Sequence, residues 1–105
     1  MIVGIGCDLC KIERVNEEIA VKILTEKELY EFNQLKNVRQ KEWLAGRFAA
    51  KEAIIKATGI KMMSEIEIMS TYEGKPTCVI KGYNVHLSIT HDGDYAMAMA
   101  VLENV

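Results

Sequence analysis

Gly46-Arg47-Phe48-Ala49-Ala50-Lys51-Glu52-Ala53 lies at the centre of the longest helix that the sequence predicts. Asn37 can cap the start of this helix, with Gln40 at the third position, and Gly59 is suited to end it after Thr58. At about 1.5 Å per residue the helix spans roughly 30 Å, the width of a small domain. Alanines recur along it at four-residue spacing, at Ala45, Ala49, Ala53 and Ala57. Such a stripe of small side chains allows another element to approach closely.

Strand patterns surround this helix on both sides. Residues 2–9 form an apolar run with two glycines, which is typical of a buried strand. Residues 11–21 and 26–34 predict two shorter helices, and Thr25 with Glu28 fits a capping box at the start of the second. After Gly59 the pattern predicts strands at 65–69, 77–81, 85–90 and 95–102, separated by turns. We therefore expect a single domain, 1–105, of the α+β class, with a mainly antiparallel sheet packed on a long central helix.

Composition excludes several classes of protein. The net charge of −2 argues against a non-specific nucleic-acid binder, and no apolar run approaches the length of a membrane span. The three cysteines are an odd set, which disfavours a disulfide scaffold. No charged and apolar leader precedes the first strand, so we expect a cytoplasmic protein without membrane partners.

Two acidic residues stand among basic ones in separate parts of the chain. Asp8 lies near the end of the first strand, and Glu52 lies one helical turn before Lys56. Two carboxylates among arginines and lysines suit Mg²⁺ held against a phosphate ester, because the carboxylates bind the cation and the bases neutralise phosphate oxygens. Two simpler interpretations stay open: Asp8 as a helix cap, and Glu52 with Lys56 as a surface ion pair.

Further polar residues follow the long helix. Ser88 and Thr90 share one strand face and His91 enters the next turn, an arrangement that suits phosphate oxygens or ordinary cross-strand hydrogen bonds.

Cys7 and Cys10 have the spacing of a redox or zinc motif, but the further ligands that a metal would need, Cys78 and a histidine, stand at no familiar spacing. We expect Cys7 to be a small buried apolar residue instead.

Taken together and in order, these segments resemble the holo-acyl carrier protein synthase family of 4′-phosphopantetheinyl transferases. The resemblance covers nearly the whole chain, and the ordered set is more specific than any single piece. The matching stretches are residues 4–8 with Ile12 and Arg14, then 24–25, 44–53 with Lys56 and Ala57, 66–68, 74–76, 85–91 and 95–96.

The resemblance implies transfer of the 4′-phosphopantetheine arm of coenzyme A to a serine of apo acyl carrier protein, with release of adenosine 3′,5′-bisphosphate. It also implies Mg²⁺, a role in fatty acid biosynthesis, and a homotrimer with active sites at subunit interfaces. Asp8 and Glu52 would bind the metal, and Lys56 would neutralise the transferred group or protonate the leaving oxygen. Glu52, or a water that it orients, would take the serine proton.

The remaining roles also follow from position in the family pattern. Contacts to coenzyme A are implied for Arg47, Lys56, Gly74, Lys75, Pro76, Ser88, Thr90 and His91. Contacts to the carrier protein are implied for Arg14 and Lys22.

This sequence departs from the family pattern in its loops. The stretch between Arg14 and Thr25 is shorter than usual, and the glycine-rich loop after the long helix keeps only Gly59. Two other functions therefore stay open beside the transferase. One is a non-catalytic module that binds coenzyme A or the carrier protein, and the other is a metal-dependent phosphohydrolase in which water replaces the serine.

Overall fold

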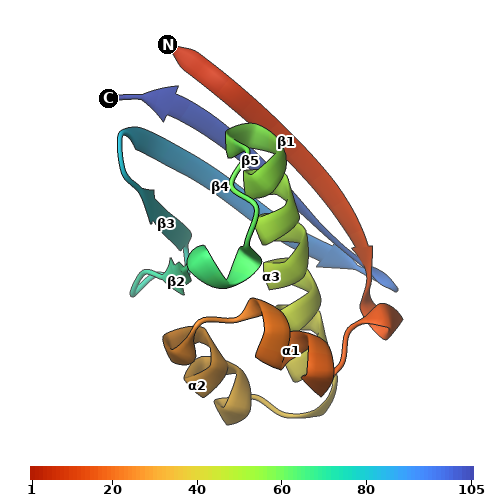
Figure 1. The fold of residues 1–105 in the computed structure, drawn as a ribbon. Coiled ribbons are helices and arrows are strands. Elements are labelled where there is room, and N and C mark those ends of the chain that lie inside the picture. The colour runs from red at the N-terminus through yellow and green to blue at the C-terminus, as the bar shows by residue number, and fades with distance from the viewer.

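Five strands form one antiparallel sheet, and helices pack on one of its faces (Figure 1). The computed structural model describes residues 1–105. In chain order the elements are β1 (Ile2–Lys11), the 3₁₀ helix η1 (Ile12–Arg14), α1 (Glu17–Ile23), α2 (Glu26–Gln34), α3 (Asn37–Thr58), the 3₁₀ helix η2 (Met63–Glu65), β2 (Ile68–Ser70), β3 (Pro76–Ile80), β4 (Tyr83–Asp92) and β5 (Tyr95–Asn104). The order across the sheet is β1-β5-β4-β3-β2. The predicted α+β class, with an antiparallel sheet on a long central helix, is confirmed.

The long helix α3 ends where the sequence predicts, after Thr58. Gly59 takes the left-handed conformation (φ 82°) and its N–H donates to Ile55 O, which ends the helix. The predicted start is wrong. Lys36 occupies the N-cap without a side-chain bond, because Asn37 takes a positive φ of 54° that asparagine tolerates better than most residues. The side chain of Gln40 donates to Phe32 O instead, and so links α3 to α2.

Small residues bring α3 directly against β1. A Cβ added at Gly6 would lie 1.9 Å from Ala53 O, and one added at Gly4 would lie 2.3 Å from Ala57 O. Only glycine permits this approach, because any side chain there would overlap the helix backbone. The neighbouring strand β5 also presents small side chains to the helix, and Ala96 and Ala98 are both fully buried. The C-terminal half of α3 therefore packs along β1 at Gly4 and Gly6, close to Asp8.

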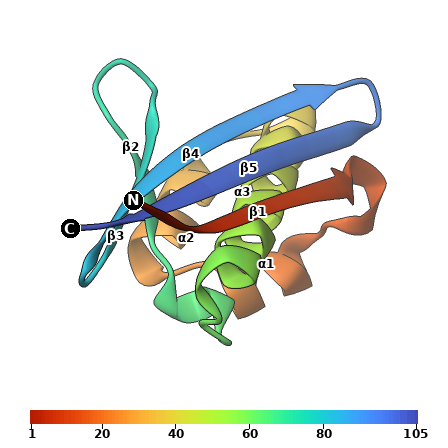
Figure 2. The same ribbon diagram turned by 90° about the horizontal axis from the view of Figure 1, so that it is seen from above.

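No helix covers the other face of the sheet, as the view from above shows (Figure 2). Its exposed apolar side chains come from β1 and β5: Val3, Ile5, Leu9, Tyr95, Met97 and Met99, with exposed fractions between 39% and 64%. Cys7 is exposed on this face, so the expectation that it is buried is wrong. Alternation along β1 turns Cys7 away from α3 and puts Cys10 in the core. The two cysteines therefore do not form a joint site.

The short helices and the edge strand differ in detail from the prediction. The single helix predicted over 11–21 is wrong: Lys11 ends β1, residues 12–14 form η1, and α1 begins only at Glu17. Asn16 caps α1 by accepting from Ile19 N. The capping box of Thr25 and Glu28 is confirmed, with both of its bonds present. The first strand after α3 is Ile68–Ser70, and η2 takes part of its predicted range. None of the helices combines the length and the apolar character that crossing a membrane requires.

Candidate active site

A polar cavity of about 370 Å³ opens where α2, α3, the turn between β2 and β3, and the end of β4 meet. Thirteen residues line it: Glu31, Leu35, Arg39, Glu42, Trp43, Gly46, Arg47, Ser70, Gly74, Pro76, Ile89, Thr90 and His91. Five of the eight predicted coenzyme A contacts are among them. Segments that are distant in the sequence therefore form one pocket.

Arg47 is the central cation of this cavity. Its side chain is almost fully buried, its Nη2 donates to Ser70 Oγ at 3.0 Å, and its guanidinium carbon lies 4.7 Å from the centre of the Trp43 ring. Burial lowers the pKa of Arg47, and Glu31 and Glu28 oppose this effect. An arginine nevertheless stays charged in proteins. Its Nε is buried and has no hydrogen-bond partner, so Arg47 carries one unsatisfied donor beside the cavity that it lines.

Other charged residues complete the electrostatics of the cavity. Arg39 and His91 add basic groups, while Glu31 and Glu42 add acids. His91 Nδ1 lies 3.6 Å from Glu42 Oε2, which is an ion-pair distance when His91 is protonated. Two arginines and a histidine against two glutamates give a site that can hold a phosphate ester beside a polar base.

The sequence analysis missed several residues of this cavity, and a signal for them exists. Arg39, Glu42, Trp43, Gly46 and Arg47 stand at positions i, i+3, i+4, i+7 and i+8, which places them on one side of α3. Only Arg47 of this set was predicted. A stripe of charged and aromatic residues at helical spacing, beside a predicted phosphate contact, indicates Arg39, Glu42 and Trp43 as well, whereas Gly46 carries no such signal.

A second polar cluster lies where α3 crosses β1. Lys56 Nζ donates to Cys7 O at 3.0 Å and to Asp8 Oδ1 at 3.1 Å. The Asp8 side chain is about one-fifth exposed and that of Lys56 is about half exposed, so solvent and ligands can reach both groups. The interpretation of Asp8 as a helix cap is wrong, because its neighbour is the ammonium group of Lys56 and η1 begins without a side-chain cap.

Glu52 is half-buried on α3, one turn before Lys56. That the carboxylates of Glu52 and Asp8 bind the same cation stays a prediction. The donor set fits Mg²⁺, which prefers carboxylate oxygens and is usually held by one or two carboxylates together with substrate phosphates. The structure contains no group of three or more acids, histidines or cysteines suited to a metal. A Mg²⁺ site made of two carboxylates and substrate phosphates does not need such a group.

The two clusters lie on different sides of α3. Arg47 and Lys56 are nine residues apart, which at about 100° per residue places their side chains on opposite sides of the helix. Asp8, Glu52 and Lys56 accordingly do not line the cavity that contains Arg47. A single chain thus separates the predicted metal ligands from most of the predicted nucleotide contacts.

The remaining predicted residues lie outside both clusters. Lys75 is exposed in the turn between Gly74 and Pro76, and Ser88 is exposed on the uncovered face of the sheet. Neither residue lines the cavity. Arg14 ends η1 and Lys22 lies in the last turn of α1, and both are exposed. Their assigned contacts stay predictions.

Proteins of known name match this chain over nearly its whole length. The chain is 43% identical to the holo-[acyl-carrier-protein] synthase of Geobacillus kaustophilus, over 100% of this chain and 92% of that protein. It is 45% identical to the holo-[acyl-carrier-protein] synthase of Oceanobacillus iheyensis, over 98% of both proteins. The alignment with the Geobacillus protein spans 118 positions, more than the 105 residues of this chain, so that relative has residues that this chain lacks.

A solved structure is similar over the full length. The holo-(acyl-carrier-protein) synthase of Bacillus anthracis, crystallised in complex with CoA (3′,5′-ADP), superposes with a TM-score of 0.94 at 39% identity, covering 100% of this chain and 99% of that one. The sequence profile of the 4′-phosphopantetheinyl transferase superfamily matches residues 4–100. From this match and the full-length relatives, the chain belongs to the 4′-phosphopantetheinyl transferase superfamily.

Proposed function

We propose that this protein is a holo-acyl carrier protein synthase. It transfers the 4′-phosphopantetheine group of coenzyme A to a serine of apo acyl carrier protein, with Mg²⁺, and releases adenosine 3′,5′-bisphosphate. Full-length similarity to proteins of that name supports the activity. The observation that carries the proposal within the structure is buried Arg47, which lines a polar cavity together with other predicted coenzyme A contacts and has an unpaired Nε.

The cavity suits the nucleotide half of coenzyme A. Phosphate oxygens can accept from Arg47, Arg39 and His91, and the backbone around Gly74 can approach a ligand without side-chain hindrance. A relative with a bound ligand described as CoA (3′,5′-ADP) has nearly the same fold, which supports this use of the cavity. The carbons of Leu35, Trp43, Pro76 and Ile89 supply the apolar part of the lining.

The second cluster supplies the groups for phosphoryl transfer. The serine oxygen attacks the phosphorus that bears pantetheine, a new P–O bond forms, and the bond to the departing nucleotide breaks. Asp8 and Glu52 would hold Mg²⁺, and the bound cation would supply positive charge against the diphosphate. Lys56 offers a positive charge or a proton to the leaving oxygen, and Glu52 takes the serine proton directly or through a water that it orients.

Separation of the two clusters supports a site shared between subunits. The cavity of one protomer would meet Asp8, Glu52 and Lys56 of the next, as in the homotrimer that the family resemblance implies. The uncovered face of β1 and β5 supplies an apolar surface for such an assembly, since exposed valine, isoleucine, leucine and methionine side chains gain free energy when they are buried. Sedimentation analysis tests the assembly, and a monomer at assay concentrations would refute it.

Arg14 and Lys22 are the proposed contacts for the carrier protein, because both are exposed at the edge formed by η1 and α1. We predict that Arg14→Ala mainly raises the KM for the carrier protein, since a peripheral charge acts on encounter more than on the chemical step. Steady-state kinetics with each substrate varied in turn measures this effect. A change confined to the KM for coenzyme A would show that Arg14 does not contact the carrier protein as proposed.

The activity is tested directly by mass spectrometry of apo acyl carrier protein incubated with coenzyme A and Mg²⁺. We expect the carrier to gain the mass of phosphopantetheine, with no gain when a chelator replaces Mg²⁺ and a rate of gain about 10²-fold lower when Glu52→Gln replaces the wild type. Binding of coenzyme A without any mass gain would favour the non-catalytic module. Release of nucleotide in the absence of a carrier would favour a phosphohydrolase. A cytoplasmic location and a role in fatty acid biosynthesis follow from the proposed activity.

A further inference from the structure

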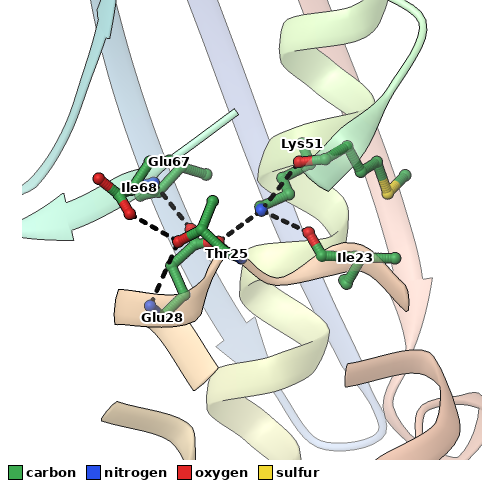
Figure 3. Close-up of polar contacts among 7 residues, drawn as sticks. Ile23, Thr25, Glu28, Lys51, Glu67 and Ile68 are labelled. Carbon is green, nitrogen blue, oxygen red and sulfur yellow. Dashed lines mark hydrogen bonds and ion pairs between the residues drawn. The ribbon is translucent and has the colours of Figure 1, made fainter. Parts of the chain in front are cut away.

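A buried ion pair joins α3 to four other segments of the chain. The side chains of Lys51 and Glu28 are both 0% exposed, and Lys51 Nζ lies 2.6 Å from Glu28 Oε1. Nζ also donates to Ile23 O at 2.6 Å and to Met63 O at 3.0 Å, so all three of its donors are used (Figure 3). We call Lys51, Glu28 and their bonded partners the Lys51 cluster.

Glu28 connects this cluster to β2. Its Oε1 also accepts from Thr25 N at 2.8 Å, and its Oε2 accepts from the backbone N–H of Ile68 at 2.7 Å. Ile68 is the first residue of β2. The carboxylate thus links α2 and α3 to the start of the edge strand, as Figure 3 shows for the labelled residues.

The hairpin of β2 and β3 has little backbone pairing with the rest of the sheet, although Ile68 and Cys78 are buried in the core. β2 has three residues and pairs only with β3, while β3 pairs with β4 through two residue pairs, Val79 with Asn84 and Ile80 with Tyr83. The turn between β2 and β3 extends away from the helices in the view from above (Figure 2). A hairpin with so little pairing depends on side-chain contacts for its position.

This hairpin forms one side of the nucleotide cavity. Ser70, two residues after Ile68, accepts from Arg47 Nη2 at 3.0 Å, and Gly74 and Pro76 line the same cavity. We propose that Glu28 and Lys51 are positioning residues for nucleotide binding: the Glu28 carboxylate holds Ile68, and through it the hairpin, against Arg47. This inference rests on the proposed function of the cavity.

The polar nature of the Lys51 cluster supports a positioning role. Apolar side chains of similar volume often replace a buried ion pair without loss of stability, so stability alone does not require these charges. Apolar side chains would fill the space but could not accept from Ile68 N. The ion pair therefore contributes a directional contact that packing cannot provide.

Two variants separate positioning from stability. Glu28→Gln keeps the size of the side chain but replaces one carboxylate oxygen by an NH₂ group. When the remaining oxygen accepts from Lys51, the NH₂ group faces the Ile68 N–H, and two donors cannot form a hydrogen bond. The double variant Glu28→Met/Lys51→Met removes the charges and fills the space. Leu102→Ala is the control, because Leu102 is buried in β5 and lines no part of the cavity.

Hydrogen exchange of the β2–β3 hairpin and calorimetric binding of adenosine 3′,5′-bisphosphate are measured together. In both test variants we expect hairpin amides to exchange about tenfold faster and the nucleotide to bind about tenfold more weakly, with kcat at saturating coenzyme A within about threefold of wild type. Unchanged hairpin exchange, or the same loss of affinity in Leu102→Ala, would overturn the inference. If the wild type binds no nucleotide while the test variants still loosen the hairpin, the proposed function fails and the positioning of the hairpin stands.

Discussion

Mixed assembly of two inactive variants tests whether the active site is shared between subunits. Arg47→Ala removes the central cation of the cavity, and Glu52→Gln removes an acid on the other side of α3. The two residues are five positions apart, about 140° around the helix axis. If each site combines the cavity of one protomer with the acids of the next, the two substitutions damage different halves of a site. Mixed oligomers then contain some sites with neither substitution.

The magnitude follows from random assembly. In an equal mixture half the subunits offer an intact cavity and half offer intact acids, so about one quarter of all sites are complete. Doubly tagged trimers exclude the pure parents, and about one third of their sites are complete. Each parent variant alone should retain about 1% of wild-type activity or less. Coexpression of the two variants with different affinity tags, followed by the carrier-mass assay on doubly tagged oligomers, should therefore recover activity more than tenfold above either parent.

A matched control uses the double variant Arg47→Ala/Glu52→Gln mixed equally with wild type. Shared sites predict about one quarter of full activity, whereas sites within one chain predict about one half. Activity of the first mixture no higher than the mean of its parents would refute the shared site and, with it, the functional reason for an oligomer.

Three further predictions concern the metal ligands, the contact between helix and sheet, and a buried thiol. Asp8→Asn and Glu52→Gln should each lower turnover by about 10²-fold or more through loss of metal-binding charge, and near-normal rates in both would break the metal assignment. Gly6→Ala should lower the free energy of unfolding by about 3 kcal/mol in urea titrations, because its Cβ would overlap Ala53 O; a loss below about 0.5 kcal/mol would contradict the close packing. Burial raises the pKa of Cys78 to about 11 from its usual 9.0. As pH rises, the thiol therefore ionises first in the unfolded state, and the free energy of unfolding should fall by about 2 kcal/mol between pH 9 and pH 11. Cys78→Ala should remove that part of the alkaline loss, and an identical pH profile in this variant would refute the cause.

Much of the fold could be predicted because its signals are local. The end of α3 at Gly59 and the capping box of Thr25 and Glu28 each depend on residues within one turn of each other. The alternation of β5, with its alanines on one face, likewise needs no distant partner. The N-cap of α3 shows the limit of such signals. Asn37 is a good cap by residue type, but it takes a positive φ where the chain passes from α2 to α3, and Lys36 occupies the N-cap position.

The candidate site was predicted in its residue types and not in its arrangement. Asp8, Arg47, Glu52 and Lys56 were selected from charge, spacing and family resemblance. That Lys56 contacts Asp8 follows only from the packing of α3 on the glycines of β1. Lys51 stands beside Glu52 in the sequence, yet it faces a different direction and is buried with Glu28, which no local pattern indicates.

Short-range chemistry in the chain established the helices, the antiparallel strands and a set of acids and bases suited to a phosphate ester, because each of these features depends on neighbouring residues. The folded structure alone determined that the cavity around Arg47 and the cluster of Asp8 and Lys56 lie apart, and that β2 is held by a buried carboxylate. These features join residues from about 20 to 50 positions apart, and such contacts arise only when the sheet, the helix and their side chains pack together.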